Sequence, residues 1–199
     1  MQAFISSDNN LMQKYNTHRN EFKNGDIVLY HGTSMMAKAI QYFDNAYFNH
    51  AGIVWIPENS NRVLTLDMWQ QGLMCLPLSR RMAGYADFCV LRPKFDFPTG
   101  YIAKGIENQN KINIAVNTAL GMWDGREVKY NYAILLRIAL IKKTGIDITG
   151  LGKKDTFICS QFVQYYTSLL GFSIYEGIKL ITPEDFLRFI DENFEILFK

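Results

Sequence analysis

The stretch Asn49-His50-Ala51-Gly52-Ile53-Val54-Trp55 places a histidine at the head of an apolar run, a composition typical of a strand. Upstream, Asp26-Ile27-Val28-Leu29-Tyr30-His31 has the same character and predicts the first strand of the sheet. Downstream, residues 62–68 and 87–91 predict two more strands, and residues 72–76 a short edge strand. Short sequence connections between these runs favour an antiparallel meander.

Apolar residues elsewhere follow the spacing of helices. The predicted helices cover residues 9–23, 34–43, 99–108, 112–120, 131–142, 157–170 and 183–194. The sequence therefore predicts an α+β fold in which helices flank a central antiparallel, barrel-like sheet. We expect residues 1–24 to form a helical extension packed on a core domain of residues 25–199.

Composition and charge exclude several classes of protein. A chain of 199 residues, 48% of them hydrophobic, fits one domain better than two. With 21 basic and 19 acidic residues, its net charge of +2 is too small to favour nucleic acid as a partner. The longest apolar stretch, residues 132–141, is about half of the roughly 20 residues that span a bilayer, so no integral membrane segment is expected. The first residues lack the pattern of a secretory signal, which makes the cytoplasm the default expectation.

The three cysteines are Cys75, Cys89 and Cys159, an odd number without a Cys-x-x-Cys spacing, which argues against a disulfide framework or a zinc knuckle. We expect Cys75 and Cys89 to be inert, buried residues of apolar strands. Cys159, in Phe157-Ile158-Cys159-Ser160-Gln161-Phe162-Val163, instead lies at the first turn of an amphipathic helix. The positive end of the helix dipole favours a thiolate there, so Cys159 is the candidate nucleophile.

A cysteine nucleophile needs a base to take its proton and a third group to orient that base. His50, at the start of a strand, is the candidate base, and Asp67, near the end of strand 62–68, is the candidate third member. If the two strands pair so that Gly52 faces Thr65, His50 and Asp67 lie close across the ladder.

These segments, with histidine before acid before cysteine, resemble circularly permuted papain-like cysteine hydrolases of the NlpC type, in particular the YiiX-like branch and its poxvirus relatives. The matching pieces are residues 25–29, 49–54, 66–67, 90–93, 129–132, 157–163 and 181–186. The resemblance implies a papain-like core with Cys159 as nucleophile, His50 as base and then acid, and Asp67 as the residue that orients His50. That third position commonly holds a glutamate in such proteins, and Asp67 is one methylene shorter.

The resemblance implies a cofactor-independent peptidase or amidase that acts on a peptide or a peptidoglycan peptide through an acyl-enzyme. Tyr130, Gln161 and Trp69 are candidate substrate contacts. Two alternatives stay open: a lipid acyl hydrolase or acyltransferase that uses the same cysteine and histidine, and an inactive structural or binding protein, for instance a virus-associated one. An enzyme that acts on the cell wall without a secretory signal would need association with a virion or release by lysis. A metal site formed by His50, Asp67 and Cys159 is a weaker alternative, because the three residues lack a paired ligand motif. The sequence specifies neither the substrate nor an oligomeric state.

Overall fold

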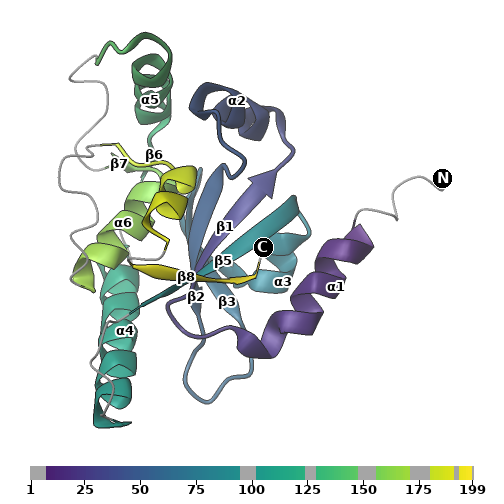
Figure 1. Cartoon of the computed structure of the whole chain (residues 1–199), viewed down its shortest axis with the longest axis vertical. Helices are drawn as coiled ribbons and strands as arrows, with labels where there is room; N and C mark the ends of the chain where they lie inside the picture. Colours follow the sequence, from purple (N-terminus) through teal and green to yellow (C-terminus); the bar gives the residue numbers. More distant parts are fainter. Residues whose placement is uncertain are drawn as a thin grey trace.

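A six-stranded antiparallel sheet with the order β4-β3-β2-β1-β5-β8 forms the centre of the molecule (Figure 1). The computed structural model describes residues 8–94, 102–123, 129–147, 156–170, 180–190 and 193–198. The strands of the sheet are β1 (Ile27–Gly32), β2 (His50–Trp55), β3 (Leu64–Trp69), β4 (Gly72–Pro77), β5 (Tyr85–Pro93) and β8 (Phe194–Phe198). Helices flank this sheet, so the predicted α+β class is confirmed.

Helices cover both faces of the sheet and one of its ends (Figure 1). On one face lie α1 (Asp8–His18), the short 3-10 turn η1 (Arg19–Glu21) and α3 (Leu78–Met82). On the other lie α4 (Ile102–Trp123), α6 (Cys159–Leu169) and the 3-10 helix η2 (Pro183–Phe189). At the end of the sheet stand α2 (Met35–Asp44), α5 (Tyr132–Thr144) and the parallel pair β6 (Lys129–Tyr130) and β7 (Thr156–Phe157).

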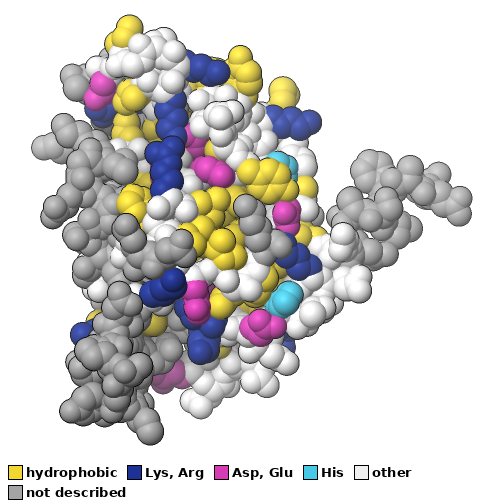
Figure 2. Space-filling view, viewed as in Figure 1, with side chains coloured by type: hydrophobic (Ala, Val, Ile, Leu, Met, Phe, Trp, Pro, Cys, Tyr) yellow, Lys and Arg dark blue, Asp and Glu magenta, His cyan; other side chains and the backbone are white. Residues whose placement is uncertain are grey.

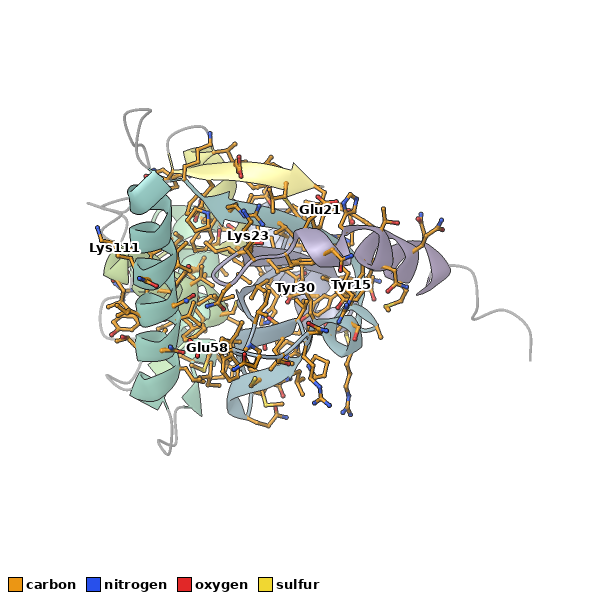
Figure 3. The ribbon with its side chains drawn as sticks, turned by 90° about the horizontal axis from the view of Figure 1, so that it is seen from below. Tyr15, Glu21, Lys23, Tyr30, Glu58 and Lys111 are labelled. Atoms are coloured by element: carbon orange, nitrogen blue, oxygen red, sulfur yellow. The ribbon has the colours of Figure 1, made fainter. Side chains whose placement is uncertain are left out.

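Alternation along β1 explains why both faces are covered. Ile27 and Leu29 belong to the core beneath α4 and α6, whereas Val28 and Tyr30 belong to the core beneath α1 and α3. In Figure 3, Tyr15 of α1 and Tyr30 lie near each other where α1 meets the sheet. Consecutive residues are also buried in β2, β3 and β5, so the central part of the sheet is stabilised by apolar packing on both faces.

The connection between the strands differs from a simple meander. Strands β2, β3 and β4 follow one another as predicted, but β5 returns to the far side of β1. Residues 194–198, which we expected partly within a helix over 183–194, form β8 and pair with β5. A helix over 183–194 was therefore wrong beyond Phe189, because pairing with β5 gives the C-terminal segment backbone partners that no local pattern reveals.

Two further expectations need correction. The helices predicted over 99–108 and 112–120 are, within the described residues, one continuous helix, α4, because the polar residues between them include no helix breaker. Residues 99–101 of the first prediction lie outside the described residues. Cys75 is exposed rather than buried, since β4 is the edge strand of the sheet, while Cys89 on β5 is buried as expected.

Candidate active site

His50 and Asp67 form a buried contact on the face of the sheet that packs against α1 and α3. Nε2 of His50 lies 2.7 Å from Oδ2 of Asp67, and the two residues are 3% and 0% exposed. The other carboxylate oxygen, Oδ1, accepts a hydrogen bond of 2.8 Å from Nη2 of Arg81 on α3. Arg81 in turn places its guanidinium 4.9 Å from the centre of the Trp69 ring. Asp67 thus joins the imidazole to a guanidinium, with one oxygen for each.

Continued by one residue, the pairing of β2 with β3 places Asp67 opposite Gly52, so the contact between His50 and Asp67 is diagonal across the two strands. Thr65 faces Val54, not Gly52, so the predicted register was wrong by two residues. The connection runs over residues 56–63 and is longer than the turn we expected. A shift of two residues keeps every side chain on its face, so His50 and Asp67 still share one face. A glycine at position 52 leaves the space through which the two side chains meet.

We expect Gly52→Ala to destabilise the protein by about 1–3 kcal/mol, because overpacking forces the strands to shift. The added Cβ would lie 2.7 Å from Oγ1 of Thr65 and 3.1 Å from Cβ of Asp67. Gly121→Ala is the matched control: no atom lies within 4 Å of its added Cβ on α4, and a helical alanine gains up to about 1 kcal/mol over glycine. Urea unfolding of both variants measures the difference, and equal stability would contradict it.

Cys159 is the first residue of α6, is 2% exposed and lies beside the start of β2. Backbone N–H groups of Ala51 and Ser160 donate hydrogen bonds to its sulfur. Burial raises the pKa of the thiol, but the charge of His50 and these hydrogen bonds outweigh burial and hold the pKa below its ordinary value. These contacts therefore favour the thiolate of Cys159 more than water does in a free cysteine.

The imidazole of His50 shows the opposite shift. Burial lowers its pKa, but the charge of Cys159 and hydrogen bonds to Asp67 and Cys159 raise the pKa to about 9. Since Nε2 contacts Asp67, Nδ1 is the nitrogen left for the sulfur. A lowered thiol pKa and a raised imidazole pKa mean that a thiolate–imidazolium pair persists between the two values.

Two tyrosines enclose this pair. Tyr130 on β6 lies opposite Phe157 of β7, which brings its phenol to the Cys159 sulfur, where the two groups hydrogen-bond. Burial, and then the charge of Cys159, raises the pKa of Tyr130 well above its ordinary value, so the phenol keeps its proton and serves as a donor. Tyr85 of β5 stacks on His50, with ring centres 6.0 Å apart and planes 11° apart.

Two cavities open beside the pair and differ in chemistry. The apolar cavity, about 230 Å³, lies between α2 and α5. Cys159 lines it together with Met36, Ile40, Leu135, Leu136, Ile138 and Ala139. The polar cavity, about 380 Å³, includes His50, Trp69, Gln70, Arg80 and Tyr130 in its lining. Figure 2 shows hydrophobic side chains on the surface at the end of the molecule formed by α2 and α5, the end that holds the apolar cavity.

The predicted substrate contacts separate into two groups. Trp69 and Tyr130 line the polar cavity with His50. Gln161 is placed elsewhere: its Oε1 accepts a hydrogen bond of 3.1 Å from N of Ile158 at the start of α6, and the described lining of neither cavity includes it. Sequence reasoning missed Arg81 and Tyr85, whose places beside Asp67 and His50 depend on contacts between separate strands that no local motif marks.

Comparisons with known proteins agree with this fold. No family model and no curated protein sequence matches the chain. Among solved structures, the chain is similar to the metalloprotein YiiX from Escherichia coli O157:H7, a DUF1105 protein. The match has a TM-score of 0.52 and 17% sequence identity, and it covers 77% of this chain and 69% of YiiX. At that identity the similarity concerns the fold.

The described residues contain neither a metal-binding cluster nor a membrane-spanning helix. No group of three or more His, Cys, Asp and Glu side chains among them is arranged to hold a metal ion. None of the helices in the described ranges is both long and apolar enough to cross a membrane.

Proposed function

We propose that this chain is a papain-like cysteine hydrolase that cleaves an amide bond of a peptide through an acyl-enzyme. One observation carries the proposal: contacts run without a break from the Cys159 sulfur through His50 to Asp67. The pKa of the nucleophile is lowered, and the pKa of the group that must return its proton is raised, which supports a thiolate and an imidazolium. Asp67 fixes the orientation of the ring from the other side.

The proposed reaction has two steps. The Cys159 thiolate attacks the carbonyl carbon, and the new C–S bond forms while the backbone N–H of Cys159 at the start of α6 helps to hold the oxyanion. His50 then gives its proton to the leaving nitrogen, and the C–N bond breaks. In the second step, water attacks the thioester while His50 takes its proton. The C–S bond breaks, the acid leaves and the thiolate returns.

A second candidate is hydrolysis or transfer of a lipid acyl group by the same three residues. The observation that favours it is the apolar cavity, because Cys159 lies in its wall beside aliphatic side chains of α5. In a transferase, a second hydroxyl or amine would replace water in the second step. An inactive binding protein is the remaining alternative, and it predicts a thiol without enhanced reactivity.

We expect iodoacetamide at pH 6.5 to alkylate Cys159 at least about tenfold faster than Cys75, because the lowered pKa of the Cys159 thiol raises its thiolate fraction. Cys75 is exposed, and burial of part of its side chain and then the charge of Asp67 raise its pKa, so accessibility alone would favour it. Peptide mass spectrometry over time measures both rates. Equal or faster labelling of Cys75 would contradict the proposed function.

A further inference from the structure

The two residues of the reacting pair, Cys159 and His50, line different cavities. Cys159 lines the apolar cavity, and His50 lines the polar cavity. In an acyl-enzyme reaction the acyl group becomes attached to the sulfur, while the leaving group receives its proton from the imidazole. The acyl part of a substrate therefore belongs in the apolar cavity, and the leaving group belongs in the polar cavity.

The polar cavity has an excess of positive charge. Arg80 and Arg81 contribute to its lining, and none of its described lining residues is an aspartate or glutamate. The carboxylate of Asp67, which is not part of the lining, neutralises the charge of Arg81. Arg80, on the exposed side of α3, makes no hydrogen bond or ion pair with the described parts of the chain. Its guanidinium is thus a cation in the wall of the cavity without a counter-ion among the described residues.

Two buried polar atoms in the same wall also lack partners. Nε of Arg81 and the hydroxyl of Tyr85 have no hydrogen-bond partner among the described residues. The Arg81 side chain is only 10% exposed, and its terminal Nη2 is committed to Asp67. Nearly all buried polar groups in proteins have partners, so two orphan donors that line the same cavity as Arg80 indicate an oxygen-rich ligand.

We propose that the polar cavity is a leaving-group site for an anionic oxygen group, a carboxylate or a phosphate, which Arg80 binds. The substrate would then join an apolar acyl group, seated beside Cys159, to an anionic leaving group, seated beside His50. This inference rests on the proposed function, because only the acyl-enzyme reaction assigns a side of the substrate to each cavity. It adds a charge requirement that the cysteine, histidine and aspartate do not impose.

The test uses thioesters of butanoic acid on the whole chain, because the substituent on their sulfur departs with the leaving group. The substituents are 2-carboxyethyl, 2-phosphonoethyl and the neutral propyl group, of matched length, and each rate of thiol release on reaction with Cys159 is divided by the rate of Cys159 alkylation by iodoacetamide on the same variant. We expect one or both anionic probes to react about fivefold to tenfold faster than the propyl probe, as a charge-assisted hydrogen bond on a partly exposed arginine would give. Arg80→Gln should remove this preference. Arg62→Gln removes an exposed arginine near the opposite end of β3 and should keep it.

The outcomes separate the two proposals. Failure of iodoacetamide itself to select Cys159 overturns the proposed function. Normal selection of Cys159 without an anion preference, or with a preference that Arg80→Gln leaves intact, overturns the anionic site and leaves the proposed function standing. The faster of the two anionic probes identifies the oxygen group that the cavity accepts.

Discussion

Cys159→Ala is expected to reduce hydrolysis of p-nitrophenyl acetate by about 10⁴-fold or more, since the alanine has no atom that can form the acyl-enzyme. The wild-type protein should release p-nitrophenol in a burst of one equivalent per Cys159, followed by slower turnover. His50→Ala should lose the burst at neutral pH, because the thiol then lacks the positive partner that lowers its pKa and the acid that completes the reaction. Stopped-flow absorbance measures the burst and the steady rate.

The double variant tests whether the two residues act as one unit. Adding His50→Ala to Cys159→Ala should cause almost no further loss, because the second residue has no thiol left to activate. Cys75→Ala is the control, since this exposed cysteine lies on the edge strand β4. A Cys159→Ala protein that keeps the burst would exclude Cys159 as the nucleophile, and additive losses would indicate that His50 acts separately.

Local sequence patterns predicted those parts of the fold that local interactions determine. The strand over 27–32 and the strand beginning at His50 follow from their β-branched runs, and Ser34 caps α2 by accepting a hydrogen bond from N of Ala37. The placement of Cys159 at the start of α6 follows from the apolar spacing after it. Each of these features depends only on residues close together in the sequence, within about two helical turns or a single strand.

Nonlocal pairing accounts for what the sequence did not reveal. The return of β5 to β1, the pairing of β8 with β5 and the register of β2 against β3 all depend on residues far apart in the chain. The candidate site likewise contains residues that local sequence identifies and residues that only the folded structure identifies. The three candidate catalytic residues could be chosen from their flanking segments, but Arg81 could not, because its role depends on the buried oxygen of Asp67 that faces α3.

That buried carboxylate makes Asp67→Asn the substitution with the broadest expected effect. An asparagine of the same shape cannot carry the charge that Arg81 faces, and breaking a buried ion pair from one side costs about 3–5 kcal/mol. The charge of Asp67 and its hydrogen bond also raise the pKa of His50, so the substitution should lower that pKa from about 9. Loss of the imidazolium as pH rises would then begin at lower pH, and the alkaline limb of the pH–rate profile should move toward neutrality.

Asp26→Asn separates this positioning role from stability. Asp26 is 1% exposed and accepts hydrogen bonds of 2.8 Å from Nε and Nη2 of the partly buried Arg92, and the pair lies outside the candidate site. Both variants should lose comparable free energy of unfolding in urea. Only Asp67→Asn should also lower kcat, by about 10²-fold or more, because neutral asparagine does not stabilise the imidazolium or fix its orientation. An unchanged alkaline limb in Asp67→Asn, or the same shift in Asp26→Asn, would reduce Asp67 to a structural residue. The shift in Asp67→Asn alone would instead make the carboxylate the group that maintains the charged imidazole beside Cys159.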